Sequence, residues 1–116
     1  MKINFEELPE YQKDLKRLLK KYRTLPSDLG AVHKDLDDEP DARPPFSFRI
    51  ENLGITSCVI KIKKIASNSF KGRGANSEFR LIYAYFEQEN RIVFVELYHK
   101  NEKENEEKER ILKYFR

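Results

Sequence analysis

The chain has 116 residues, of which 37% are charged and 39% hydrophobic, and its formal net charge is +3. This length suits one domain, and the sequence lacks both an apolar signal segment and a run of about 18 apolar residues that could cross a membrane. One cysteine, Cys58, excludes an internal disulfide, and no Cys/His group has the spacing of a metal site. We therefore expect a single cytoplasmic domain over residues 1–116, without a cofactor or a metal ion.

The charge is distributed unevenly along the chain. Residues 12–23 contain six Lys and Arg against one Asp, and residues 58–100 contain eight Lys and Arg against four Glu. Residues 35–41 contain five acids and no base. Local basic regions attract phosphate groups even when the total charge is small.

The first 36 residues predict a short strand followed by two helices. Residues 2–5 alternate in polarity, which predicts a strand at a sheet edge. An apolar stripe at spacings of three and four predicts a helix over 7–22, with Pro9 in its first turn. A second stripe predicts a helix over 25–36. Two helices joined this closely predict a helical hairpin.

The middle of the chain is less regular. Residues 37–48 combine acids with three prolines, which predicts a surface loop. Residues 48–50 are compatible with a short strand, and Asn52-Leu53-Gly54 predicts a turn. The segment 67–78 is rich in small and turn-forming residues, but it lacks the spacing of a phosphate-binding P-loop.

Three consecutive antiparallel strands are predicted within residues 58–100. Alternating β-branched and aromatic residues begin at Cys58 and continue over 79–86 and 91–99, with a short polar link at 87–90. The residues expected to point into the core are Ile60, Ile62, Leu81, Val93, Val95 and Leu97. The residues expected on the exposed face are Lys61, Lys63, Arg80, Glu96 and Tyr98. A wholly solvated face is the alternative interpretation of these cations.

The last residues, 101–116, contain five acids and five bases, and they predict a C-terminal helix from about Asn105. The whole sequence therefore predicts an α+β fold. In this fold an N-terminal helical hairpin packs on a small antiparallel sheet of about four strands, followed by the C-terminal helix.

The order of these elements, with three short segments, resembles small bacterial toxins of the RelE/ParE superfamily. The segments are Lys61-Ile62-Lys63, Phe79-Arg80-Leu81-Ile82-Tyr83, and Val93-Phe94-Val95 through Tyr98-His99-Lys100. The first is similar to the RelE strand that holds catalytic lysines, the second to the central strand with its arginine, and the third to the Tyr-His ending of the YoeB branch.

This resemblance implies a toxin that cleaves mRNA in the decoding site of the ribosome and is repressed by a co-encoded antitoxin, in a toxin–antitoxin hetero-oligomer. The implied reaction is attack of a ribose 2′-OH on the adjacent phosphate, which gives a cyclic phosphate and a free 5′-OH. Two alternatives share the fold: a ParE-like inhibitor of DNA gyrase, and an inactive member that binds only an antitoxin.

The implied chemistry suggests roles for six residues. Arg80 is expected to grip phosphate oxygens, with added charge from Lys61 and Lys63. His99 is the expected general acid, and Glu96 is a candidate base. Tyr98 is expected to stack on a base or orient the phosphate.

Structural roles remain open for these residues. An ion pair between Arg80 and Glu96 across the sheet is one alternative, and His99 capping the core is another. The other cations of the basic regions are expected to contact RNA, with a solvated surface as the alternative: Lys16, Arg17, Lys20, Lys64, Lys71, Arg73 and Lys100.

Overall fold

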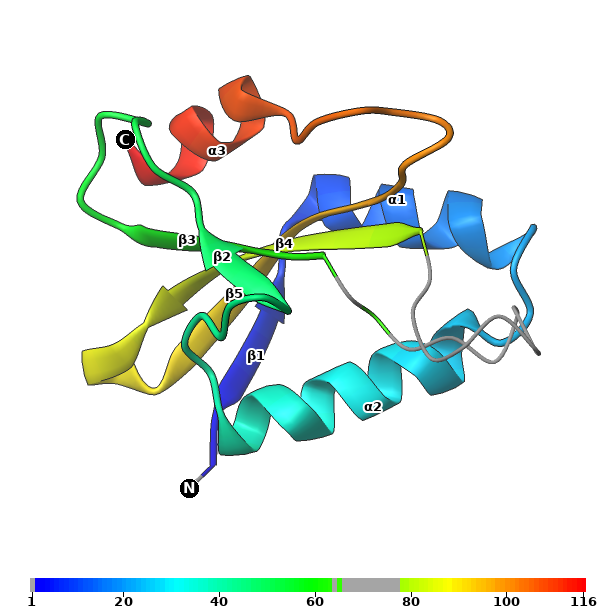
Figure 1. Cartoon of the computed structure of the whole chain (residues 1–116), viewed down its shortest axis with the longest axis horizontal. Coiled ribbons are helices and arrows are strands. Elements are labelled where there is room, and N and C mark those ends of the chain that lie inside the picture. The colour runs from blue at the N-terminus through cyan, green and yellow to red at the C-terminus, as the bar shows by residue number, and fades with distance from the viewer. Residues whose placement is uncertain (1, 64, 66–77) are drawn as a thin grey trace.

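The computed structural model describes residues 2–63, 65 and 78–116, and within them it contains a five-stranded sheet. The strand order is β1-β5-β4-β3-β2 (Figure 1). The strands are β1 (Asn4–Glu7), β2 (Ser47–Arg49), β3 (Cys58–Ile62), β4 (Phe79–Phe86) and β5 (Arg91–His99). The sheet therefore has five strands and not the four that the sequence predicts, because both short flanking segments join its edges.

The antiparallel run β3-β4-β5 forms the centre of the sheet, as the alternation predicts. A single 3-10 turn over Glu87–Glu89 joins β4 to β5, and Asn90 follows with a φ of 48°. Asparagine tolerates this left-handed conformation better than most residues. Asn90 therefore allows the polar link to form a tight turn between β4 and β5. The segment 67–77 of the predicted basic loop lies outside the described residues.

The N-terminal elements pack differently from the predicted helical hairpin. β1 pairs with β5 in parallel, and the Leu8 N–H extends this alignment by donating to the Phe94 carbonyl oxygen at 3.0 Å. Helix α1 (Pro9–Leu19) then continues beside the second half of β5. Since β5 and not α2 is the main partner of α1, the two helices do not form a clear hairpin, and the sheet is mixed and not purely antiparallel.

Helices α2 (Leu25–Asp38) and α3 (Lys108–Phe115) lie on opposite sides of the sheet (Figure 1). The α2 side includes the stacked rings of His33 and Phe94, whose centroids are 4.8 Å apart. On the α3 side, Phe115 contacts Phe86 with centroids 6.0 Å apart. Both faces are therefore partly covered, and α3 begins three residues later than predicted. No helix within the described parts of the chain is long and apolar enough to cross a bilayer.

A bulge in β5 changes the predicted core face. Ile82 is opposite Glu96, but Tyr83 is opposite Phe94, so Val95 is an extra residue in β5. Strand parity predicts that Val93 and Leu97 point to the same side. This prediction is wrong, because the extra residue reverses the alternation between them. Both are nevertheless buried, since α3 covers one face and α2 the other.

Candidate nucleic-acid interface

Lys61, Arg80 and Tyr98 lie on one face of the sheet. Arg80 is directly opposite Tyr98, and Lys61 is opposite Ile82, which is two residues after Arg80 on β4. Side chains two residues apart on a strand share a face, as do directly opposite partners, so the three point to the same side. The side of the sheet that carries Lys61, Lys63, Arg80, Glu96 and Tyr98 is called the Tyr98 face below.

Lys63 continues this face toward the sheet edge. It lies two residues beyond Lys61, and its Nζ is 5.0 Å from the centroid of the Phe48 ring. Phe48 is the β2 partner of Lys61, so all three side chains are on the same side. The exposed Lys63 ammonium is attracted to the electron-rich face of this ring. Arg80 is half-buried, and its Nη1 donates to the Phe79 carbonyl oxygen at 3.1 Å.

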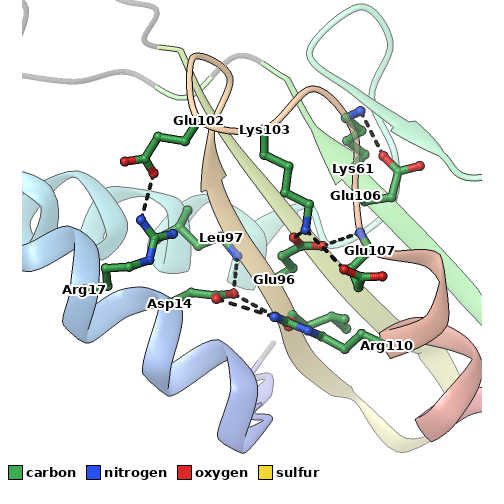
Figure 2. A network of polar contacts seen from close by, with 11 residues as sticks. Asp14, Arg17, Lys61, Glu96, Leu97, Glu102, Lys103, Glu106, Glu107 and Arg110 are labelled. Carbon is green, nitrogen blue, oxygen red and sulfur yellow. Dashed lines mark hydrogen bonds and ion pairs between the residues drawn. The ribbon is translucent and has the colours of Figure 1, made fainter.

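The charge of Lys61 is neutralised within the chain. Its Nζ is 2.9 Å from Oε1 of Glu106, and the two side chains are only 14% and 11% exposed (Figure 2). Burial disfavours the charged form of Lys61, but its interactions with Glu106 and Tyr98 together outweigh burial and raise the Lys61 pKa. Burial likewise opposes the ionised form of Glu106, but the bond from Lys61 lowers the Glu106 pKa. Both groups are therefore charged at neutral pH.

Glu96 is held by the segment that follows β5. Its side chain is 2% exposed and forms an ion pair with Lys103, and its Oε1 accepts the backbone N–H of Glu107 at 2.7 Å (Figure 2). The sequence predicts Glu96 on an exposed face, and this is wrong, because residues 100–107 fold over it. The structure thus gives the Glu96 carboxylate a structural partner on the Tyr98 face.

Tyr98 is also covered, with 2% of its surface exposed. The Nζ atoms of Lys61 and Lys103 are 5.9 and 5.7 Å from the centroid of its ring. Its buried hydroxyl has no hydrogen-bond partner among the described residues. Burial raises the pKa of Tyr98, and the nearby Lys61 ammonium partly offsets this effect. The prediction that Tyr98 is exposed is therefore wrong, for the same reason as for Glu96.

His99 points to the opposite side of the sheet. It is 3% exposed, and its ring stacks on Tyr22 with centroids 5.5 Å apart and meets the edge of Phe79 at 5.2 Å. Its Nδ1 accepts the backbone N–H of Asn101 at 3.1 Å, so the neutral ring carries its proton on Nε2. Burial lowers the pKa of His99. The structure therefore separates His99 from the other five predicted catalytic residues.

The basic face of α1 extends the positive surface. Lys16, Arg17 and Lys20 are exposed, as is Lys100 at the end of β5. Arg17 donates through Nη1 to Oε1 of Glu102 at 2.8 Å (Figure 2). The other predicted RNA contacts lie outside the described residues: Lys64, Lys71 and Arg73.

Three ion pairs that organise this region were not predicted from the sequence: Asp14–Arg110, Glu96–Lys103 and Lys61–Glu106. Asp14 of α1 binds Arg110 of α3 at 2.7 Å and accepts the Leu97 N–H at 3.2 Å, while Arg110 donates to the Val95 carbonyl oxygen at 2.8 Å. The alternating charges after Lys100 were an available signal for the contacts of Lys103 and Glu106. Nothing in the local sequence pairs Asp14 with Arg110, because they are far apart in the chain.

The described residues do not resemble a metal centre. Across residues 2–63, 65 and 78–116, no group of three or more His, Cys, Asp or Glu side chains is arranged to hold a metal ion. The arrangement consists of fixed cations beside an aromatic ring on the Tyr98 face and along α1. Cations and rings of this kind can bind the phosphates and bases of single-stranded RNA.

Comparisons with known proteins identify the fold. No family model matches the chain, and no curated protein matches it. Among solved structures, the chain is similar to one from the crystal structure of the archaeal RelE–RelB complex from Pyrococcus horikoshii OT3. The TM-score is 0.58 at 14% sequence identity, and the match covers 89% of this chain and 100% of that chain. The chain therefore has a RelE-like fold.

Proposed function

We propose that this chain is the toxin of a toxin–antitoxin module and inhibits translation by cutting mRNA on the ribosome. The observation that carries the proposal is the group of cations on the Tyr98 face of a RelE-like sheet, in which Lys61 and Arg80 lie on the same side. The similar solved structure is a RelE–RelB complex, which supports an antitoxin as the second partner.

The proposed chemistry is an internal transfer within RNA. The ribose 2′-oxygen attacks the adjacent phosphorus, the bond to the 5′-oxygen breaks, and the products are a cyclic phosphate and a free 5′-OH. Negative charge grows on the phosphoryl oxygens in the transition state, so a guanidinium and ammonium groups around them accelerate the reaction. Arg80 is proposed as the main phosphate ligand, with Lys61 and Lys63 as supporting charges.

Proton transfer is assigned only where the geometry allows it. Glu96 is the carboxylate of the Tyr98 face, and when Lys103 leaves it, it can accept the proton of the 2′-OH. The leaving 5′-oxygen takes its proton from water, which yields the free 5′-OH. Tyr98 is proposed to stack on a base of the bound RNA. His99 is left out of this chemistry, because its ring packs on the other side of the sheet.

A second candidate is a ParE-like protein that inhibits DNA gyrase without cutting RNA. The specific observation in its favour is the position of His99, which leaves the Tyr98 face without the expected histidine acid. A protein that only binds its target needs no acid or base there. The two candidates differ in the process that stops first when the protein is produced.

Expression of this chain alone in a bacterium tests the proposal. We expect growth arrest with an early loss of amino-acid incorporation, while thymidine incorporation continues. Arg80→Ala should relieve the arrest, because it removes the main phosphate ligand. Arg49→Ala is the matched control, since Arg49 is an exposed cation on β2. A block in thymidine incorporation before any loss of translation would favour the gyrase candidate instead.

A further inference from the structure

The segment over residues 100–107 crosses the Tyr98 face and is anchored at both ends. At its start, the backbone N–H groups of Glu102 and Lys103 donate to the His99 carbonyl oxygen at 2.9 and 3.2 Å. Lys103 then pairs with Glu96, and the Glu107 N–H donates to the same carboxylate. Figure 2 shows Lys103 and Glu106 of this segment directed toward Glu96 and Lys61 on the strands, and Glu102 directed toward Arg17 on α1.

Two carboxylates of this segment bind cations that are candidates for RNA contacts: Arg17, expected from the sequence to contact RNA, and Lys61, proposed as a supporting charge at the phosphate. Oε1 of Glu102 is 2.8 Å from Nη1 of Arg17, and its other oxygen is 3.9 Å from Nζ of Lys21. Oε1 of Glu106 is 2.9 Å from Nζ of Lys61. A carboxylate oxygen at this distance takes the place that a phosphate oxygen would take. RNA and the segment therefore compete for the same donors.

The closed arrangement contains a polar group that it does not satisfy. The hydroxyl of Tyr98 is buried beside Lys61 and beneath the segment, and it has no hydrogen-bond partner among the described residues. A buried hydroxyl without a hydrogen-bond partner destabilises the closed arrangement. When the segment moves away, water or RNA could form a hydrogen bond with this hydroxyl and remove that cost. The Lys61 ammonium beside the hydroxyl compensates part of this cost, and three ion-paired side chains hold the segment closed.

We infer that the 100–107 segment is an autoinhibitory strap, in which Glu102 and Glu106 stand in for RNA phosphates on Arg17 and Lys61 until RNA displaces them. This inference rests on the proposed function and deepens it, because it states how access to the same site is regulated. In the closed state Lys61, Glu96 and Tyr98 are covered together. Displacement of the strap frees all three in one movement.

A charge-matched pair of double variants tests the strap. E102Q/E106Q removes both phosphate-like carboxylates with little change of shape. E104Q/E109Q changes the net charge equally at two exposed residues that form no ion pair with another residue in the described part of the chain. Binding of a short labelled single-stranded RNA of mixed sequence is measured by fluorescence anisotropy at one salt concentration. We expect E102Q/E106Q to bind about tenfold more tightly than the wild type, and E104Q/E109Q to change little beyond general charge.

A second measurement uses the unmodified protein. The Glu107 N–H is bonded to Glu96 at 2.7 Å only while the strap is closed, so its hydrogen exchange reports on opening. Saturating RNA should accelerate this exchange. Equal tightening by both double variants, or slower Glu107 exchange with RNA, would overturn the strap while leaving the proposed function intact. Failure of every protein to bind RNA would also overturn the strap, whereas the proposed function is overturned separately, by the absence of mRNA cleavage in a translation reaction.

Discussion

At the scale of single residues, the strand position of His99 was predicted correctly from the sequence, but its neighbours were not. Its position at the end of β5 matches the expectation, but its ring lies between Tyr22 and Phe79 and not beside Arg80. Strand parity put His99 on the side of Leu97, and the structure agrees with that parity. The core-capping alternative therefore describes its packing.

The buried histidine should make stability depend on pH. Burial lowers the pKa of His99 from its usual 6.5, so below that value the unfolded state binds more protons than the folded state. The contribution of neutral His99 to the free energy of unfolding should therefore be fully present above about pH 6.5. It should decrease as the pH falls below 6.5 toward the lowered pKa of the folded state. Protonation of Nδ1 would also remove the acceptor of the Asn101 N–H.

His99→Asn tests this linkage, because an amide oxygen can replace Nδ1 as an acceptor but does not titrate. We expect this variant to lose about 2 kcal/mol at pH 7.5 through lost ring packing. Its further loss between about pH 7.5 and 5.5 should be smaller than that of the wild type. Urea unfolding at both pH values measures the two losses, and His33, whose pKa burial also lowers, titrates equally in both proteins. An unchanged pH dependence would show that His99 does not contribute.

At the scale of elements, the bulge in β5 is the feature that sets which side chains reach the Tyr98 face. The carbonyl oxygen of the extra residue, Val95, accepts a hydrogen bond from Arg110. The backbone N–H of Leu97, two residues later, donates to Asp14. The Asp14–Arg110 pair thus replaces strand pairing beyond the end of β1. It joins α1, β5 and α3 at one point (Figure 2).

Asp14→Ala should destabilise the protein by about 3 kcal/mol, because it leaves the Arg110 charge and the Leu97 N–H without their partner in a site only 15% exposed. Lys113→Ala is the control, since the Lys113–Glu10 pair also joins α1 to α3 but its lysine is 66% exposed. That change should cost less than about 1 kcal/mol. Chemical denaturation measures both, and equal costs would contradict a special role for the Asp14–Arg110 pair.

Local patterns were enough to predict the central elements. Alternation located β3, β4 and β5, and helical spacing located α1 and α2, because each pattern is set within a few neighbouring residues. The parallel pairing of β1 and the bulge at Val95 depend on contacts between distant segments. The same distinction applies to the site. Strand alternation correctly predicted that Lys61 and Arg80 share a face of the sheet. No local pattern indicated that the segment with Lys103 and Glu106 folds back over this face.

At the scale of the whole molecule, the net charge of +3 is a small difference between many positive and many negative side chains. Some of these form ion pairs on the Tyr98 face and along α1. The C-terminal acids pair with cations of α1 and β3, so the folded chain presents less positive surface than its basic segments suggest. In the proposed account these internal pairs are exchanged for phosphates when mRNA binds. The RelE-like fold supplies the sheet that holds the cations in place.

The central claim is that this protein cuts mRNA on the ribosome and that the cations of the Tyr98 face stabilise the transition state of the cleavage. Mapping of mRNA 5′ ends in a translation reaction with purified ribosomes and the purified protein tests it most directly. The account predicts new ends with a free 5′-OH inside the codon that occupies the decoding site, reduced by about 10²-fold or more for Arg80→Ala. An absence of new ends at concentrations that stop growth, or new ends that persist equally with Arg80→Ala, would contradict it.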